Sequence, residues 1–308
     1  MVEVSGSVSG HGLRAEETIS RFIQQPSVSA VDTGTQLLLA AMWREASQRG
    51  HTPSFADVAF SNFSQTEEDG IIWLLVSLLG ARTRRIVEFG AGDGTECNAA
   101  NLILNHGWDA FLVDGDAANV ELGRSFLSTR SIRRILPPHF VQSWVTRENV
   151  NALLADNGVT GQVDILSIDL DGIDYWVWDA IDVIDPAIVI MEFNASWLAD
   201  ASVTVPYRAD FAAQWIELDR IDPRTGTPPI VSYHGASLPA LVRLGRRKGY
   251  RLIGTNALGF NAFFVKAELR PELFPEVAAE DCFDHPPAWL HHLTEGQELL
   301  KQFAWESV

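Results

Sequence analysis

The stretch VEFGAGDGTE, residues 87–96, places three glycines between an apolar run and a segment with helical patterning. Because glycine lacks a Cβ, Gly90, Gly92 and Gly94 allow a tight turn and a close approach of the backbone to a ligand. The helix that follows offers free N–H groups at its start. The dinucleotide fingerprint is G-x-G-x-x-G, whereas this stretch has G-x-G-x-G, with Glu88 two residues before the first glycine. The stretch therefore predicts a ligand-binding turn after a strand.

Short apolar runs alternate with helical patterns on both sides of this turn. Such alternation predicts a parallel sheet with helices on both faces. Near the end of the chain, a helix over residues 237–249 is followed by two strands around Asn256–Gly259, which predicts a hairpin and an antiparallel last strand. We therefore predict a Rossmann-like α/β fold with a seven-stranded, mostly parallel sheet. The first five strands are expected at residues 84–90, 109–115, 139–145, 163–169 and 187–194.

The overall composition limits the kinds of partner. The formal net charge of −17 repels phosphate backbones, so nucleic acid is not an expected partner. The longest apolar run, residues 71–81, is too short to span a bilayer, and the N-terminus lacks the features of a signal peptide. Cys97 and Cys282 form neither a disulfide framework nor a metal motif. We therefore expect a cytoplasmic protein without a membrane or nucleic-acid partner.

Four segments together resemble the class I S-adenosylmethionine-dependent methyltransferases, and within them the FkbM-like branch. They are FSQTEEDGI (63–71), EFGAGDGTECNAANLILNHGWDAFLVDGD (88–116), DILSIDLDGIDYW (164–176) and IVIMEFN (188–194). The resemblance implies S-adenosyl-L-methionine as the cofactor and methyl transfer to a small molecule, at a hydroxyl oxygen. The fourth strand departs from the commoner Asp-x-Glu-Gly of that branch, because here it ends in Asp169-Leu-Asp171-Gly.

The resemblance also implies positions for the cofactor. The residues expected to hold the methionine part are Glu88, Gly90, Gly92 and Asp93, with Gln65 and Glu68 close to it. Asp114 is expected at the ribose, because a carboxylate about 20 residues beyond the turn can accept hydrogen bonds from ribose hydroxyls, as it also does in dinucleotide folds. Trp144 or Val145 is expected to face the adenine; alternatively, Trp144 belongs to the core.

The predicted domain is flanked by two further segments. Residues 1–60 are expected to form an N-terminal helical extension, whose apolar residues 37–43 either pack on the domain or form a homodimer interface. The methyltransferase domain is expected over residues 61–268, with an insert at 195–235 over the acceptor site. Residues 269–308 are expected to form a C-terminal appendage or lid.

Oxygen-bearing side chains follow the fourth and fifth predicted strands. Ligands bind at the carboxyl ends of strands in open α/β sheets, so Asp169, Asp171, Glu192 and Asn194 are expected at one rim. Three interpretations remain open. Asp169, Glu192 and Asn194 bind Mg²⁺, or Asp169 acts without metal as a base or positions the acceptor. In the third, Asp171 caps the next helix and Asp169 binds backbone amides.

Two further residues are catalytic candidates. His234 lies in a loop and is a possible base near neutral pH, or simply a surface turn residue. Tyr207 lies in the insert, where Trp197 and Phe211 either line an acceptor pocket or form a small core. Three other functions remain open: cyclisation or elimination at the sulfonium, a non-catalytic cofactor-binding subunit, and a dehydrogenase.

Overall fold

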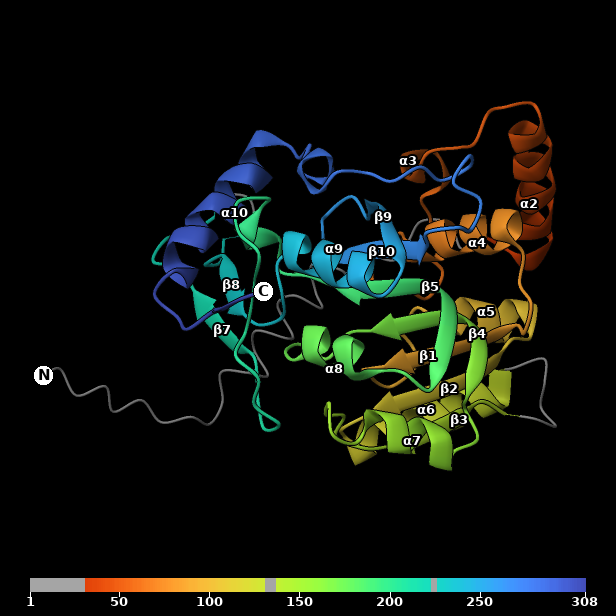
Figure 1. The fold of residues 1–308 in the computed structure, drawn as a ribbon, viewed down its shortest axis with the longest axis horizontal. Coiled ribbons are helices and arrows are strands. Elements are labelled where there is room, and N and C mark those ends of the chain that lie inside the picture. Colours follow the sequence, from red (N-terminus) through yellow and green to blue (C-terminus); the bar gives the residue numbers. More distant parts are fainter. Residues whose placement is uncertain (1–30, 131–136, 223–225) are drawn as a thin grey trace, which may run out of the picture.

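The computed structural model describes residues 31–130, 137–222 and 226–308. Its centre is a seven-stranded sheet (Figure 1). The strands are β1 (Arg85–Phe89), β2 (Asp109–Asp114), β3 (His139–Gln142), β4 (Gly161–Ile168), β5 (Ile184–Glu192), β9 (Tyr250–Thr255) and β10 (Asn261–Lys266). Their order is β3-β2-β1-β4-β5-β10-β9, and β10 runs antiparallel to both of its neighbours. This is the predicted class I methyltransferase architecture, and the fold prediction is confirmed.

The sheet is apolar on both faces because its central strands carry aliphatic side chains at successive positions. Ile86, Ile165 and Ile188 lie in register across β1, β4 and β5 and belong to the core on one face. The row next to it, which contains Leu166 and Val189, belongs to the core on the other face. Side chains alternate between faces along a strand, so this pattern needs helices on both sides.

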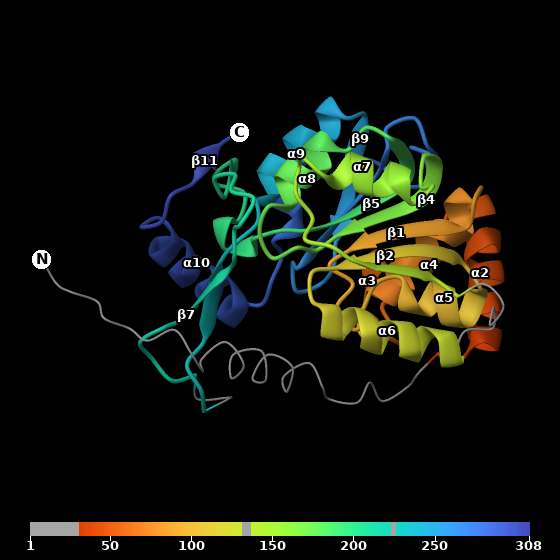
Figure 2. The same ribbon diagram turned by 90° about the horizontal axis from the view of Figure 1, so that it is seen from below.

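Helices cover both faces of the sheet (Figure 2). One face is covered by α2 (Thr33–Gln48), α3 (Phe55–Val58), α4 (Glu68–Leu79), α5 (Ala100–His106) and α6 (Ala117–Arg130). The other is covered by α7 (Val150–Asp156), α8 (Asp174–Ala180) and α9 (Leu238–Arg247). None of the helices in the described ranges combines the length and apolar character needed to cross a membrane.

The N-terminal helix α2 packs on α4, which is one of the two arrangements expected for this extension. Ala40 and Trp43 are buried, and the Trp73 indole donates a 2.6 Å hydrogen bond to the Gln36 carbonyl. The exposed side of the same helix carries Leu37, Leu38 and Met42. The helical pattern expected at residues 16–30 lies outside the described residues.

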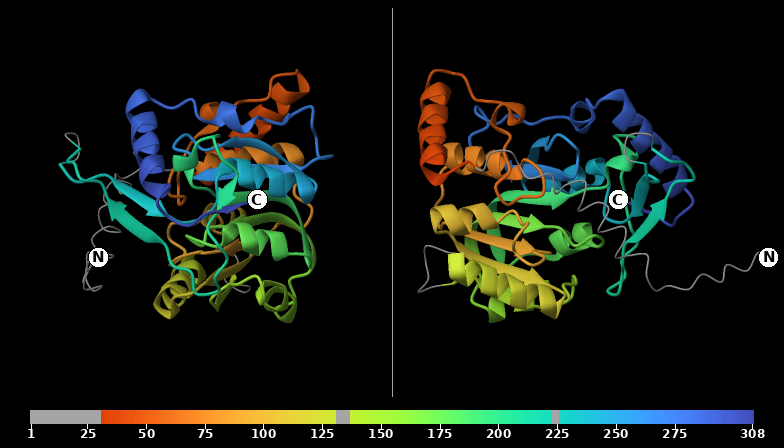
Figure 3. Two further views of the ribbon diagram at one scale, coloured as in Figure 1. Left: turned by 60° about the vertical axis from the view of Figure 1, so that its left-hand side comes forward. Right: turned by 180° about the vertical axis from the view of Figure 1, so that it is seen from behind.

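The insert and the C-terminal segment fold together into one lobe, beyond the carboxyl ends of the central strands (Figure 3). We call it the insert lobe; it comprises residues 195–222, 226–235 and 287–308. Its elements are η1 (Ala195–Trp197), β6 (Val203–Thr204), β7 (Gln214–Glu217), β8 (Ile230–Tyr233), α10 (Pro287–Leu300) and β11 (Glu306–Ser307), while η2 (Ala279–Cys282) precedes it. Strand β11 pairs with β6, and α10 packs on η1. Trp197 and Phe211 are buried, so they form a core rather than an open pocket.

A buried carboxylate fixes the entry into β1, and its removal is a test of the fold. Asp164 on β4 accepts hydrogen bonds from the backbone N–H groups of Arg82, Thr83 and Arg84. Asp164→Ala leaves these donors unsatisfied and is expected to lower the free energy of unfolding by about 3 kcal/mol. The measurement is denaturant unfolding. The exposed Asp179 is the control, because losing its ion pair with Arg247 should cost less than about 1 kcal/mol. Equal losses in the two variants would contradict the prediction.

Candidate functional site

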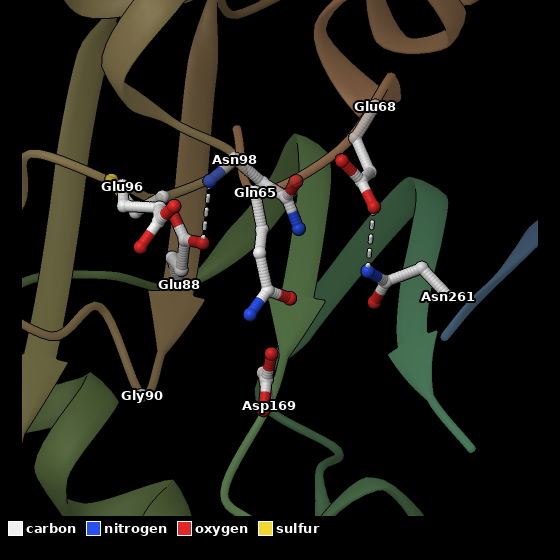
Figure 4. A pocket seen from close by; sticks show the side chains of 9 residues that line it. Gln65, Glu68, Glu88, Gly90, Glu96, Asn98, Asp169 and Asn261 are labelled. Atoms are coloured by element: carbon white, nitrogen blue, oxygen red, sulfur yellow. Dashed lines mark hydrogen bonds between the residues drawn. The ribbon is translucent and has the colours of Figure 1, made fainter. Parts of the chain in front are cut away.

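A cavity of about 100 Å³ lies where the carboxyl ends of β1 and β4 meet the start of α4 (Figure 4). Its lining contains predicted site residues from three distant parts of the chain: Gln65, Glu68, Glu88, Gly90 and Asp169. Sequence reasoning missed the other lining residues, which are Glu96, Cys97, Asn98 and Asn261. The glycine turn and the rim of the sheet therefore enclose one site.

The cavity is strongly acidic. Glu68, Glu88, Glu96 and Asp169 line it, and no lysine, arginine or histidine is among the lining residues. Burial raises the pKa of Glu88 to about 7. Burial also raises the pKa of Asp169 well above its ordinary value, and the carboxylates of Glu192 and Asp171 add to the effect. Such a site favours a cationic ligand and repels a phosphate.

Glu88 holds the start of α5 beside the cavity. Its Oε1 accepts a 2.9 Å hydrogen bond from the Asn98 N–H, and its Oε2 accepts a 2.8 Å bond from the Ala99 N–H. The Asn98 side chain in turn donates to the Ser167 hydroxyl on β4 at 3.0 Å. A carboxylate has about four acceptor positions, so Glu88 keeps acceptor capacity for a ligand.

Glu68 and Asn261 form the opposite wall. The Glu68 Oε1 accepts hydrogen bonds from the side-chain amides of Asn256 (2.8 Å) and Asn261 (3.1 Å), while its Oε2 accepts from the Thr66 N–H at 2.9 Å. The Asn261 Oδ1 is buried and has no hydrogen-bond partner among the described residues. An unpartnered acceptor in an acidic cavity suits a ligand that donates hydrogen bonds, such as an ammonium group.

The glycine turn connects the cavity to β2. Gly90 has a φ of 80°, and a Cβ built there would lie 1.5 Å from the Asp169 carbonyl oxygen. The N–H of Gly92 donates a 2.9 Å hydrogen bond to the Asp114 Oδ2, and the Asp114 Oδ1 accepts from the Asp116 N–H at 2.8 Å. Asp114 therefore lies at the end of β2, directly beside the turn. Asp93, in contrast, turns towards Thr95, whose N–H donates to it at 3.0 Å, and it does not line the cavity.

The two candidates for the adenine side differ in exposure. Trp144 is 56% exposed, so the core interpretation of this residue is wrong. Its ring lies against Gly115, where an added Cβ would be 2.9 Å from it, and its indole N–H donates to the Ala209 carbonyl at 2.7 Å. Val145 is buried. The predicted strand is too long here, because β3 ends at Gln142; the next residue, Ser143, donates from its N–H to the Asp114 carbonyl at the end of β2.

The expected cap after β4 belongs to a different aspartate. The carboxylate of Asp174 accepts hydrogen bonds from the N–H groups of Leu170 (2.7 Å) and Gly172 (3.0 Å). The structural interpretation of Asp171 is therefore wrong; this residue has a left-handed φ of 50° and an exposed side chain. The Asp169 side chain accepts no hydrogen bond from the described residues, so its expected binding of backbone amides is also wrong.

His234 lies inside the molecule beside Glu192, so the surface-turn interpretation is wrong as well. Its Nε2 is 3.3 Å from the Glu192 Oε1. Burial alone would lower the pKa of His234, but the carboxylates of Glu192 and Asp171 raise it to about 9. Burial raises the pKa of Glu192 to about 7. Without a bound cation the imidazole is therefore protonated near neutral pH and is not a free base, and a cation bound at its nitrogen would displace that proton.

Asn194 and Tyr207 are engaged elsewhere. The Asn194 Oδ1 accepts from the Ser196 N–H at 3.2 Å, and its amide group donates to the carbonyls of Ser232 and His234. Its amide thus fixes the end of β8, and we do not place it among the ligands of a cation. The Tyr207 hydroxyl donates to Glu148. Burial and this bond raise the phenol pKa, which makes Tyr207 a poor base.

Comparison with known proteins yields only distant structural similarity. The sequence matches no protein-family profile, and no curated protein matches it. An S-adenosylmethionine-dependent methyltransferase from Clostridium acetobutylicum ATCC 824 is 11% identical, with a TM-score of 0.41 over 75% of this chain and 98% of that chain. Magnesium protoporphyrin IX methyltransferase from Synechocystis PCC 6803 is 12% identical, with a TM-score of 0.39 over 77% and 99%. The glycopeptide N-methyltransferase MtfA is 14% identical, with a TM-score of 0.36 over 58% and 85%.

Similarity at this level assigns neither an activity nor site residues. The fold class rests on the strand order with its antiparallel β10, and the ligand class rests on the cavity itself.

The close approach at Gly90 can be tested directly. Gly90→Ala places a methyl group against the Asp169 backbone, so the two strand ends must separate, and we expect unfolding to become easier by at least about 3 kcal/mol. Gly158→Ala is the matched control: its φ is 72°, but nothing lies within 4 Å of the added Cβ. Only the left-handed strain of about 1 kcal/mol should appear there. Thermal and denaturant unfolding measure both, and similar losses would show that the contact with Asp169 is unimportant.

Proposed function

We propose that the protein is an S-adenosylmethionine-dependent methyltransferase that methylates a small molecule at a hydroxyl oxygen. The observation that carries this proposal is the acidic cavity beside the glycine turn, with its unpartnered Asn261 oxygen. S-Adenosylmethionine carries a sulfonium and an ammonium group, and both complement this lining. A dinucleotide would bring a pyrophosphate to the same turn, where four carboxylates repel it. The choice of a hydroxyl, and the placement near the FkbM-like branch, rest on the sequence resemblance.

The order of the strands supports a position for the whole cofactor. A cavity of about 100 Å³ accommodates only part of such a ligand, namely the methionine end. Strands β2 and β3 follow β1 outwards in the sheet, so Asp114 and then Trp144 lie progressively further from the cavity. In our proposal, Asp114 accepts hydrogen bonds from the ribose hydroxyls and Trp144 or Val145 contacts the adenine. Gln65, Glu68, Glu88 and Gly90 surround the methionine end.

Asp169 is the proposed catalytic residue. It lines the cavity, and its carboxylate also interacts with those of Glu192 and Asp171 beyond it. A bound sulfonium would lower the raised pKa of Asp169, because an opposite charge favours the ionised form. The ionised carboxylate can then orient the acceptor hydroxyl in line with the methyl group and receive its proton. His234 pairs with Glu192 and Tyr207 with Glu148, so neither takes the proton in this step.

The position of the insert lobe favours an acceptor site beside the loop that follows β4. Phe211 lies against the loop after β4, since a Cβ at Gly172 would be 2.7 Å from its ring. We propose that residues 195–235 border the acceptor and that the C-terminal segment 269–308 acts with them as a lid. An all-oxygen Mg²⁺ site formed by Asp169, Glu192 and Asn194 is left out of this proposal, because the Asn194 amide already makes three hydrogen bonds.

The ribose assignment predicts a loss of cofactor affinity. Asp114→Ala removes the acceptor of the ribose hydroxyls and the anchor of the Gly92 N–H. We expect the affinity for S-adenosylhomocysteine, measured by calorimetric titration, to fall by about 10- to 100-fold. Asp116→Ala, two residues away and exposed, should bind like the unmodified protein. An unchanged affinity of Asp114→Ala would remove this residue from the ribose site.

The catalytic role of Asp169 predicts that its substitution lowers the rate of methyl transfer but not the affinity for the cofactor. Asp169→Asn is expected to slow methyl transfer by about 100-fold or more, because general-base catalysis typically contributes that much. Its affinity for S-adenosylhomocysteine should change by less than about threefold, since the amide retains the shape of the carboxylate. Release of S-adenosylhomocysteine over a panel of hydroxylated small molecules measures turnover. A fully active variant would exclude the role, and formation of methylthioadenosine would indicate elimination or cyclisation instead.

The cavity also predicts a pH dependence of binding. The pKa of Glu88 is about 7 without ligand, and only its ionised form attracts the ligand ammonium. The affinity for S-adenosylhomocysteine should therefore rise by about five- to tenfold from pH 6 to pH 8. The stability of the ligand-free protein should change in the opposite direction. Because the folded-state pKa of Glu88 exceeds its ordinary value of 4.5, the free energy of unfolding falls as the pH rises from 4.5 to about 7. Calorimetry at constant ionic strength measures the binding, and a flat or falling affinity would contradict the prediction.

A further inference from the structure

A second cluster of polar side chains lies beyond the cavity, where β4, β5 and β8 end. Asp171, Glu192 and His234 each offer one potential ligand atom, and these atoms all lie within 4.8 Å of one another. Asp171 is exposed, Glu192 is half-buried and His234 is buried, so the cluster opens to solvent on one side. We call these three residues the His–carboxylate cluster.

Buried polar atoms in this cluster lack partners. His234 is 6% exposed, and neither of its ring nitrogens makes a hydrogen bond with the described residues. Its Nε2 approaches Glu192 Oε1 at 3.3 Å without the alignment of a hydrogen bond, and Glu192 Oε2 is buried with no partner. Buried polar atoms in folded proteins are nearly always satisfied, so unpartnered nitrogen and oxygen atoms on adjacent residues indicate a missing ligand.

The surroundings hold the imidazole in place without satisfying it. The Trp215 ring stacks on His234 with 6.2 Å between ring centroids and 20° between planes. The Asn194 amide donates to the His234 carbonyl at 3.1 Å. The aromatic neighbour thus sets the plane of the ring and Asn194 fixes the backbone, while both ring nitrogens stay without a hydrogen bond among the described residues.

The charge around the cluster indicates the sign of the missing ligand. Asp171 and Glu192 face one imidazole here, and the Asp169 carboxylate is close enough to interact with both carboxylates. Asp174, which is also close, is satisfied by the N–H groups of Leu170 and Gly172. Partly buried carboxylates with a net negative charge require a cation nearby.

We propose that Asp171, Glu192 and His234 bind a divalent transition-metal ion. Two carboxylate oxygens and one imidazole nitrogen form a mixed ligand set, which suits ions such as Zn²⁺ and Co²⁺ better than Mg²⁺ or Ca²⁺, whose protein ligands are oxygen atoms. Metal–ligand bonds of about 2.1 Å place neighbouring ligand atoms about 3 to 4 Å apart, so small side-chain rotations are enough to close the set.

The cluster opens to solvent at Asp171, and the Asp169 carboxylate interacts electrostatically with both Asp171 and Glu192. A role of the ion in catalysis rests on the proposed methyl transfer. In that reaction the ion would lie next to the acceptor and bind its hydroxyl oxygen. A bound ion would make that hydroxyl more acidic and fix its orientation, while Asp169 receives the proton.

Metal binding can be tested without cofactor or acceptor. The full chain, freed of metal by a chelator, is titrated with Zn²⁺ by calorimetry and with Co²⁺ by visible absorption. We expect one ion per chain at the cluster, Co²⁺ absorption bands of a nitrogen–oxygen site, and much weaker binding of Mg²⁺. His234→Gln and Glu192→Gln should each weaken Zn²⁺ binding by at least about 100-fold, because loss of even an outer partner of a metal ligand typically costs 10- to 100-fold.

Two further variants keep the test decisive. Asp171 is exposed, and asparagine tolerates its left-handed backbone, so the Asp171→Asn variant should fold normally. Its affinity for Zn²⁺ should still fall by at least about tenfold. His285→Gln is the matched control, since His285 is also buried with an unpartnered Nε2 but lies outside the cluster. It should bind Zn²⁺ normally.

Three results would overturn the inference: no binding of Zn²⁺ or Co²⁺, equal affinity for Mg²⁺, or equal losses in His285→Gln and the cluster variants. A parallel titration with S-adenosylhomocysteine separates this result from the proposed function. Cofactor binding without metal binding would refute only the metal site, and metal binding without cofactor binding would refute only the methyltransferase proposal.

Discussion

At residue 90 the chain has no room for a side chain, and the site depends on that constraint. A Cβ on Gly90 would lie 1.5 Å from the Asp169 carbonyl oxygen, so two loops that leave adjacent strands touch through their backbones. This contact brings Asp169 to the cavity wall opposite Gln65, as Figure 4 shows. The same turn places the Gly92 N–H on Asp114. The absence of a side chain at Gly90 therefore allows the ends of β1, β2 and β4 to lie close together.

The sequence predicted those features in which a local pattern of residues is compatible with only one local structure. Apolar runs between helices gave the sheet, and the glycine spacing located Glu88 and Asp114. The features that it did not predict depend on contacts between distant segments. Asn261 reaches the cavity only because β10 runs antiparallel beside β5, and nothing in its own neighbourhood indicates a ligand. Asp171 was the predicted cap, but its left-handed backbone leaves its side chain exposed, and the carboxylate of Asp174 accepts the hydrogen bonds instead.

The histidine was the most difficult residue to interpret from sequence, because its burial depends on the insert lobe. Tyr233 precedes it on β8, and its ring stacks on Phe303 with a centroid distance of 4.7 Å and meets Trp305 edge-on. The Tyr233 hydroxyl also donates to the Ala304 carbonyl at 2.5 Å. Aromatic residues from the end of the chain thus hold the strand that presents His234. A loop histidine in the sequence becomes a buried group through contacts made about seventy residues away.

The hydrogen bond from Asn261 to Glu68 joins residues that are 193 positions apart. Contacts of such long sequence separation carry a large loop-closure entropy, because the intervening chain must lose conformational freedom before they form. The cavity wall at α4 and β10 therefore exists only when most of the molecule has already assembled. A ligand that binds only the assembled cavity adds its binding free energy to the stability of the complete fold. The cellular level of that ligand would then influence how much of this protein survives proteolysis.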